Sequence, residues 1–517
     1  MNLVNKIRPL PAAFRYSKTF GSMQCLRFKH IPASPLSTAH PTIIDSLEKP
    51  NVRDLLENVM HTSPSKRELQ QFLKRYEPLS IPNRSTASSV PSPKDFVSDL
   101  LTPAYTNQLS LTKIEAPFHK KEWIAVGATL HKLQKLGLTS VVVVDNPSWH
   151  ELGRENCTAT MMRESMALVE AIQKAGGRAQ LIYGGLLEST QPGTKHGHLH
   201  VNLDFVYAAL NNHQIPVILP LHDKRPIASQ LVMTSLAAKL SRLPDTRLVP
   251  NKIVIINHKG GIPNHEYNGS ISHSLINVQE EYDSIMQSWQ PEWQYPNADL
   301  TMVRDCLALL SPISASAVIT PVSSLPNALI ANLVTDKPLY SSSLPHHQQL
   351  HRINTSRTTI LRHGIKIQKY QSLDQLNLPR LTALLEASFQ RSLDSRGFYD
   401  RLHRVLDSAI IAGDYQGVVL MTQEAPSIFY LDKFAIAPTS QGIGLTDILW
   451  RRMCDSYPEL LWRSRKDNGV NKWYFERSHG YWRLPDSNWV LFWYGSQGYR
   501  HVQQYANIAT HIPASFT

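Results

Sequence analysis

Apolar and polar positions in the first large part of the chain follow two alternating spacings. Nearly continuous apolar runs of strand length occur at residues 139–144, 179–183, 215–219, 252–256 and 317–321. Stretches with helical spacing separate them, at residues 158–175, 225–243 and 299–310. Strands that alternate with helices predict a mainly parallel sheet with helices on both faces. We therefore expect an αβα sandwich over residues 96–344.

A polar stretch at residues 340–352 interrupts this pattern, and we interpret it as a domain boundary. Beyond it, at residues 353–513, the elements are shorter and strands follow one another directly. The spacing predicts strands at 366–370, 409–412, 417–422, 430–437, 459–464 and 488–494, and helices at 378–389, 399–407 and 471–479. This order predicts a second domain of the α+β class.

The most informative stretch of this second domain begins with the strand at residues 430–437, which Pro438 ends. A turn with Gly442 and Gly444 follows, and apolar residues then recur at helical spacing from Leu445. Glycines have no Cβ to obstruct a ligand, and the amides at a helix start favour a phosphate. The stretch therefore predicts a phosphate-binding turn between a strand and a helix.

The order strand, glycine turn, helix, strand, helix resembles the acetyl-CoA-binding half of the GNAT family of N-acetyltransferases. The segments LDKF, WRSR and NKWYF narrow the resemblance to the acetyltransferase domain of the N-acetylglutamate synthase family of fungal and vertebrate type. It implies a GNAT fold with a mixed sheet, and transfer of acetyl from acetyl-CoA to the α-amine of L-glutamate. The implied acetyl-CoA contacts are Phe434, Ala435, Ile436, Gln441, Gly442, Ile443, Gly444, Leu445 and Thr446.

Acetyl transfer by direct attack needs no enzyme nucleophile, and no Ser/His/Asp or Cys/His arrangement stands out in the sequence. A backbone amide near Phe434 or Ala435 is the simplest stabiliser of the oxyanion. Tyr474 is our candidate general acid for the departing thiolate, because the pKa of a phenol is close to that of a thiol. The resemblance adds Asn468 as a second catalytic candidate. Tyr474 as a plain core residue remains the alternative.

Several cations indicate an acidic amino-acid substrate. Arg463 and Arg465 are two residues apart, so they share one face of a strand, and guanidinium groups suit carboxylates. Lys433 is on the neighbouring strand, and Arg391 could reach the same place from a helix end. The resemblance extends the substrate-binding set to Ser464, Lys466, Asp467 and Asn468. A charged, solvated strand face is the other interpretation.

Two passages of the first domain, NKIVIINHKGGIP and ASAVITPVSSLPNALIANLVTDKPL, resemble the amino-acid kinase fold. Such a kinase holds the transferred phosphate with two early glycine-rich turns. At these places the chain reads LTKIEAPFHKK and VVVVDNPSWHE, without a glycine pair, although Lys113 remains. We therefore predict a degenerate kinase domain with a structural or regulatory role. The resemblance implies L-arginine as an effector, a homo-oligomer and association with N-acetylglutamate kinase.

The chain has 517 residues and a net charge of +12, which would favour an acidic partner such as nucleic acid. However, six basic residues precede the first acidic one, Asp45: Lys6, Arg8, Arg15, Lys18, Arg27 and Lys29. A basic, acid-free N-terminus with Ser and Thr is typical of a mitochondrial presequence, here residues 1–44, and implies the matrix. A disordered cytosolic tail is the alternative. We expect no nucleic-acid partner.

The rest of the composition excludes other classes. Residues 45–95 contain helical spacing followed by a Pro- and Ser-rich linker. The absence of a long uninterrupted apolar run argues against a membrane span. The four cysteines are scattered without metal-ligand spacing, so we expect no metal. Two other functions stay open: a non-catalytic arginine- or CoA-binding subunit of a partner kinase, and an active N-acetylglutamate kinase with an appended acetyltransferase-like module.

Overall fold

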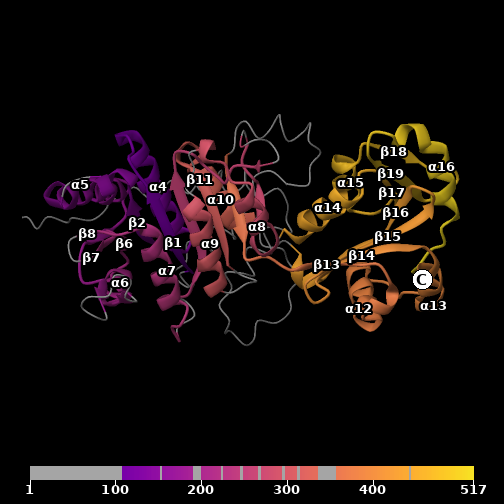
Figure 1. Cartoon of the computed structure of the whole chain (residues 1–517), viewed down its shortest axis with the longest axis horizontal. Helices are drawn as coiled ribbons and strands as arrows, with labels where there is room; N and C mark the ends of the chain where they lie inside the picture. The colour runs from indigo at the N-terminus through magenta and orange to yellow at the C-terminus, as the bar shows by residue number, and fades with distance from the viewer. Residues whose placement is uncertain are drawn as a thin grey trace, which may run out of the picture. The chain divides into compact units, whose positions relative to one another are not determined.

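The structure is a computed structural model of the whole chain (Figure 1). The residues it describes are 108–151, 154–189, 199–222, 225–244, 248–265, 269, 271–293, 297–310, 315–335, 357–441 and 444–516. The predicted presequence at 1–44, the helical preface and linker at 45–95 and the polar boundary at 340–352 lie outside these residues.

An eight-stranded sheet forms the first domain. Its order is β10-β12-β11-β9-β1-β2-β6-β3. The strands are β1 (Gln108–Glu115), β2 (Leu138–Asp145), β3 (Ala179–Ile182), β6 (Ile215–Ile218), β9 (Pro250–Asn257), β10 (Leu275–Asn277), β11 (Ser316–Pro321) and β12 (Thr359–Arg362). All neighbours run parallel except β11 and β12. The predicted, mainly parallel sheet is confirmed.

Helices cover both faces of this sheet, because its strands are apolar on both sides. One hydrophobic core lies under α4 (Lys120–Lys135), α5 (Arg154–Lys174) and α10 (Asn327–Thr335). The other lies under α6 (Asp204–Asn211), α7 (Ser229–Leu240), α8 (Val278–Gln287) and α9 (Asn297–Leu309). The αβα sandwich is therefore confirmed.

Short elements connect these layers. Two small antiparallel pairs are β4 (Leu187–Ser189) with β5 (Leu199–Val201) and β7 (Leu221–His222) with β8 (Arg225–Pro226). Single 3₁₀ turns are η1 (Pro147–Glu151), η4 (Pro291–Trp293) and η5 (Val322–Ser324).

The structure differs from the predicted boundaries in several places, including the following two. The helix predicted at 225–243 begins only at Ser229. Pro226 lacks an N–H and disfavours the helical conformation for Arg225, so both residues pair with β7 instead. In addition, β12 belongs to the first sheet although it follows residue 344, and it lies inside the range predicted for the second domain.

The second domain is built on a seven-stranded sheet of order β13-β14-β15-β16-β17-β19-β18. Its strands are β13 (Ile367–Tyr370), β14 (Leu406–Ala412), β15 (Gly417–Ala425), β16 (Ile428–Ile436), β17 (Leu460–Arg465), β18 (Gly480–Arg483) and β19 (Trp489–Tyr494). β16 and β17 are parallel, and every other neighbouring pair is antiparallel. The predicted mixed sheet is confirmed.

Helices pack on both faces of this sheet as well. The helices are α12 (Leu378–Phe389), α13 (Ser395–Val405), α14 (Leu445–Ser456), α15 (Asn471–Arg477) and α16 (Gly498–His511), with the 3₁₀ turns η6 (Leu373–Gln375) and η7 (Pro438–Ser440). Alternate strand residues contribute to different cores: Leu460 and Trp462 face α14, whereas Leu461 faces α16. Residues of α12 and α13 pack on the face opposite α14. One face therefore carries α14 and α15, and the other carries α12, α13 and α16.

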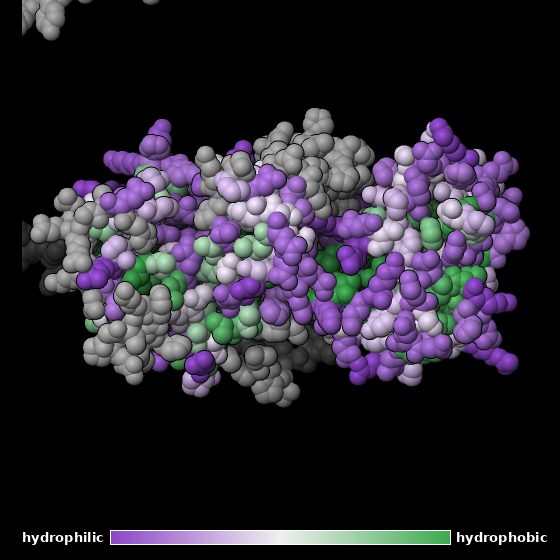
Figure 2. Space-filling view, viewed as in Figure 1, coloured by the Kyte–Doolittle hydropathy of each residue, from purple (hydrophilic) through white to green (hydrophobic). Residues whose placement is uncertain are grey.

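The surface view of the described residues is mostly hydrophilic, with smaller hydrophobic areas among the charged ones (Figure 2). None of the helices in the described ranges combines the length and the apolar character needed to cross a bilayer.

Candidate functional site

The central strands β16 and β17 of the second sheet part soon after they meet. They are in register at one pair, Tyr430 with Leu461. β16 continues to Ile436 along β15, and β17 continues to Arg465 along β19, but past this pair they do not bond to each other. We call this divergence the splay. Because alternate backbone groups of a strand point to each edge, β16 presents donors and acceptors to the splay, which an extended ligand can pair with.

A β-bulge in β16 lies where the strands part. Leu420 pairs with Lys433 and Met421 with Leu431, so Asp432 is the extra residue. A bulge bends the strand and increases its twist, which turns the end of β16 away from its neighbour. The predicted acetyl-CoA contacts Phe434, Ala435 and Ile436 all follow this bulge.

The side chains of these three residues pack into the protein. The Phe434 ring lies 6.1 Å from that of Trp450 and 6.0 Å from that of Trp473, measured between centroids. Ala435 and Ile436 are buried, in the cores on opposite faces of the sheet. What this part of β16 offers a ligand is therefore its backbone.

Gly444, which has φ 82°, directly precedes the helix α14 and is its N-cap. Glycine adopts this left-handed conformation without strain. The first N–H groups of a helix have no intrahelical partner, and in α14 they belong to Leu445 and Thr446. Gln441 precedes this start, whereas Gly442 and Ile443 lie outside the described residues. The helix start is thus suited to an anion such as a phosphate.

Tyr474 lies on α15, on the same face of the sheet as α14. Its ring is 5.4 Å from Trp462, 5.6 Å from Phe492 and 6.4 Å from Trp450. Burial raises the pKa of Tyr474 to about 12. Its phenol is therefore protonated at neutral pH and able to donate a proton.

A buried arginine, which sequence reasoning missed, connects the helix of Tyr474 to α14. Arg477 lies 3.7 Å from Asp447 in the first turn of α14, and its guanidinium lies 4.1 Å from the Trp473 ring centroid. Arg477 is 3% exposed. The sequence feature that could have identified Arg477 is its position three residues after Tyr474, one helical turn away. The ion pair fixes α15 relative to the glycine-capped helix.

Arg463 and Arg465 share one face of β17 but have different surroundings. Arg463 lies over the Trp489 ring at 4.2 Å from the centroid and donates to the carbonyls of Ala509 and, at 3.2 Å, of Pro513. Arg465 is more exposed, with 41% of its side-chain surface accessible, and its Nε donates to Asp467 at 3.2 Å. Arg465 is thus the more accessible of the two guanidinium groups.

Lys433 is buried next to Asp432, which also accepts a hydrogen bond from Arg401. Burial alone would raise the pKa of Asp432, but Lys433 and Arg401 outweigh it and hold that pKa below its usual value. Burial lowers the pKa of Lys433, and the nearby charge of Arg463 lowers it further. Lys433 and Arg463 are therefore close enough for their charges to interact.

Of the remaining predicted residues, Lys466 and Asn468 directly follow β17. Asn468 donates from Nδ2 to Ser464 Oγ at 2.9 Å and accepts from the Val470 N–H at 3.1 Å. Lys466 donates to the carbonyl of Ser487 at 2.7 Å. Arg391 is exposed in the loop after α12. That Arg391 and Lys466 share one site with the other predicted cations stays a prediction.

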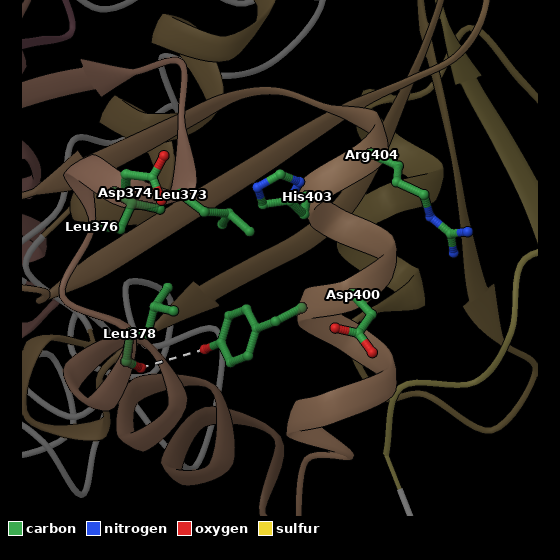
Figure 3. A pocket seen from close by; sticks show the side chains of 8 residues that line it. Leu373, Asp374, Leu376, Leu378, Asp400, His403 and Arg404 are labelled. Atoms are coloured by element: carbon green, nitrogen blue, oxygen red, sulfur yellow. Dashed lines mark hydrogen bonds between the residues drawn. The ribbon is translucent and has the colours of Figure 1, made fainter.

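A cavity of about 750 Å³ lies elsewhere in the second domain, between η6, the start of α12 and α13 (Figure 3). It is lined by Leu373, Asp374, Leu376, Leu378, Tyr399, Asp400, His403 and Arg404. The Tyr399 hydroxyl donates to the Leu378 carbonyl at 3.3 Å, and Arg404 points outward. None of the predicted site residues lines it, and we place the candidate site at the splay because the donor-rich strand edge and the helix start are there.

In the first domain, Lys113 is buried among three carboxylates at the carboxyl ends of β1 and β2. Its Nζ lies 2.6 Å from Asp299, 3.2 Å from Asp145 and 3.5 Å from Glu115. The carboxylates raise the pKa of Lys113 against the opposing effect of burial. Ligands of parallel sheets bind at this edge, and here three carboxylates surround Lys113.

Comparison with known proteins agrees with this geometry. Residues 368–512 match the family model described as NAT, N-acetyltransferase, of N-acetylglutamate synthase. This match, the splay and the glycine-capped helix define the C-terminal domain as a GNAT-type N-acetyltransferase domain. A solved isopentenyl phosphate kinase of T. acidophilum aligns with 49% of this chain and 100% of its own, at 10% identity and a TM-score of 0.31.

Relatives extend the similarity over most of the chain. The mitochondrial amino-acid acetyltransferase of Laccaria bicolor is 34% identical over 86% of this chain and 92% of its own length. That of Coprinopsis cinerea is 34% identical over 78% of this chain and 74% of its own. The chain therefore belongs to the amino-acid acetyltransferase family, and it is an acyltransferase.

Proposed function

We propose that the chain transfers acetyl from acetyl-CoA to the α-amine of L-glutamate, by direct attack in a ternary complex. The observation that carries this proposal is the splay between β16 and β17, which opens beside the glycine-capped start of α14. An extended thioester arm has backbone partners along β16 there, and a pyrophosphate has the helix start.

The donor would use backbone groups rather than side chains. The packed side chains of Phe434, Ala435 and Ile436 support this assignment, as does the burial of Leu445. Amides on the edge of β16 can stabilise the oxyanion that forms at the acetyl carbonyl, because they are fixed before the reaction. Gln441, Gly444 and Thr446, with Gly442 and Ile443, complete the proposed acetyl-CoA contacts.

Direct attack fits the chemistry of the three thiols in the described ranges. Burial raises the pKa of Cys454, on α14, well above its usual range, and it also raises the pKa of Cys157 and Cys306. A protonated thiol is a poor nucleophile. The amine of the acceptor would therefore attack the thioester itself. Tyr474 would protonate the leaving thiolate, with Asn468 orienting the reacting groups.

The acceptor would be a dicarboxylic amino acid. Arg465 is accessible and has the guanidinium fork that suits a carboxylate, and Arg463 and Lys433 add positive charge nearby. A second carboxylate is the feature that distinguishes glutamate from neutral amino acids. Arg391, Ser464, Lys466 and Asp467 complete the proposed acceptor surroundings.

We propose that the first domain no longer transfers phosphate. Three carboxylates close around Lys113, and a nucleotide phosphate approaching them would be repelled. The domain would instead serve assembly and sensing of L-arginine, in a homo-oligomer that associates with N-acetylglutamate kinase. The names of the relatives support a mitochondrial location, and the reaction would be the first step of arginine biosynthesis.

The test is a thiol-release assay on the purified chain with acetyl-CoA and single amino acids. We expect release with L-glutamate and much less with glutamine, aspartate or ornithine. Release that is independent of the amino acid, or a preference for a neutral one, would refute the substrate. A parallel assay with MgATP and N-acetylglutamate should show no phosphoryl transfer, and transfer would revive the kinase alternative.

A further inference from the structure

The last residues of the described chain run across the candidate site. We name residues 512–516, which follow α16, the C-terminal strap. We propose that the strap is the outer wall of the acceptor site, locked in place by Arg463 and Lys433, and that it sets selectivity for a dicarboxylic acceptor. This inference rests on the proposed function and deepens it.

The strap connects two elements on the same face of the second sheet. It leaves the end of α16 and reaches the loop between α12 and α13, as the yellow trace in Figure 1 shows. There Phe516 forms an antiparallel bridge with Leu393, and the Asp394 N–H donates to the Ser515 carbonyl at 3.0 Å. The Phe516 ring lies 4.6 Å from that of Phe389. The strap is therefore anchored at both ends.

The position of α14 identifies this face as the acceptor side. The helix start that suits a phosphate belongs to α14, which packs on one face of the sheet. The strap, α12, α13 and α16 occupy the other face. A donor held along β16 with its phosphates at α14 leaves the opposite face for the incoming amine. The strap crosses that face where β16 and β17 part.

Arg463 holds the first part of the strap. Its guanidinium donates to the Ala509 carbonyl in the last turn of α16 and to the Pro513 carbonyl at 3.2 Å. A cation at a helix C-terminus is favourable because the last carbonyls lack intrahelical partners. Arginine has five donors, so these two bonds leave others for a substrate. Arg463 thus links the strap to the end of β17.

Lys433 holds the second part. Its ammonium donates to the Ser515 hydroxyl at 3.1 Å and to the Asp432 carboxylate, and it lies 3.3 Å from the Asp432 carbonyl. The rings of Phe398 and Phe516 face it at 4.8 and 5.7 Å from their centroids. An ammonium group has three donors, and these contacts use all of them. Lys433 therefore locks the strap in place.

The consequence is a site whose acceptor wall is supplied by the strap. With the strap in place, the space beside Arg463 and Arg465 is bounded and a carboxylate can be held in one orientation. Without the strap, water reaches both cations and the acceptor binds less tightly. The loss should appear in acceptor binding and selectivity and leave donor binding unchanged.

The experiment compares the full chain with variants of the strap in the thiol-release assay. Three separate variants weaken the strap to different extents. They are a chain ending at Ile512, Phe516→Ala and Ser515→Ala. Ala514→Ser is the matched control, since Ala514 is exposed on the same segment. Melting temperature and acetyl-CoA binding are measured for each, so that a fold defect in the truncated chain is separated from the point variants.

We expect the truncation and Phe516→Ala to raise the KM for glutamate by about 10-fold or more, the size typical of losing a bond to a charged group. The KM for acetyl-CoA should stay within about twofold. The kcat/KM values for glutamine and aspartate should rise relative to that for glutamate, since the contacts that enclose the acceptor set specificity. Phe516→Leu should restore most of the selectivity. Lys433→Met should give the same pattern, and adding Ser515→Ala to it should cause little further change.

An unchanged or lower KM for glutamate in folded strap variants would overturn the inference, as would equal rises in both KM values. A full-length chain that uses acetyl-CoA with another acceptor but not glutamate would instead refute the proposed function. The two failures are therefore distinguishable by the full-length chain alone.

Discussion

Tyr430 on β16 is in register with Leu461 on β17, and this is the single pair that joins the two strands. After this pair the bulge at Asp432 bends β16, and the two strands do not pair again. The proposed donor site and the proposed acceptor site are both defined by this divergence. The variants below test the parts that surround it.

Gly444→Ala should weaken donor binding specifically. The φ of 82° at this position costs a residue with a Cβ about 1 to 2 kcal/mol, so the start of α14 should shift. We expect the KM for acetyl-CoA to rise by about 10-fold, since every 1.4 kcal/mol is tenfold in affinity. Steady-state kinetics checks this, with Gly184→Ala as control, because a Cβ there meets open space. An unchanged KM for acetyl-CoA would count against the helix start as the phosphate site.

Arg465→Ala should mainly raise the KM for glutamate. Loss of a charge-assisted bidentate pair costs about 1.5 to 3 kcal/mol, or roughly 10- to 150-fold. Arg465→Lys should restore only part of the affinity, because an ammonium lacks the guanidinium fork. Arg483→Ala, at an exposed cation of the edge strand β18, is the control. Equal losses for both substrates, together with a lower melting temperature, would indicate that Arg465 only supports the fold.

Tyr474→Phe should lower kcat by about 100-fold or more and leave both KM values near their original size, as for loss of a general acid. Because burial raises the pKa of Tyr474 to about 12, the phenol stays protonated through neutral and moderately alkaline pH. Ionisation of Tyr474 should therefore not reduce kcat below about pH 10. A pH–rate profile of both proteins checks this. A variant with full kcat would assign Tyr474 to the core.

Lys113→Met should destabilise the first domain by about 3 to 5 kcal/mol, because it leaves the buried Asp145 and Asp299 and the partly buried Glu115 without the Lys113 charge. The folded-state pKa of Lys113 is raised above 10.5, so its stabilising contribution is complete below that pH and is lost only as the pH rises through the folded-state value. At neutral pH the wild-type chain therefore has the full stabilising contribution of Lys113.

The destabilisation of Lys113→Met should shrink as the pH falls, because protonation removes the unpaired negative charges. Urea unfolding at two pH values measures this. Lys174→Met, in an exposed pair with Glu170, should change stability by less than about 0.5 kcal/mol. If both variants had equal, small effects, the cluster around Lys113 would not be holding the edge of the sheet.

Local signals predicted much of the second domain. The helix α12 has the predicted bounds because Asn377 caps it and Pro379 fits its first turn, while Gln390 ends it in a left-handed conformation. The strand before the glycine turn was equally clear from its apolar run and Pro438. Both are cases in which the residues that begin and end an element are adjacent to it in sequence.

Features that depend on distant residues could not be predicted in the same way. The bulge at Asp432 exists only in the register with β15, and no local pattern fixes that register. Arg463 donates hydrogen bonds to residues 46 and 50 positions later in the chain. These partners determine how many of its N–H donors remain for a substrate. The strands β1 and β18 and the helix α16 were not predicted either. The sequence drew attention to the cations of β16 and β17, but it did not indicate which groups hold them.

The central claim is direct transfer of acetyl to the α-amine of glutamate at the splay. The measurement that tests it most directly uses acetyl-CoA with an isotopically labelled acetyl group, and mass spectrometry of both the product and the intact protein in a single turnover. Direct transfer should place labelled acetyl on the α-nitrogen of glutamate and none on the protein at any time. Label that appears on the protein before the product, or an acetylated product that forms without glutamate, would contradict it.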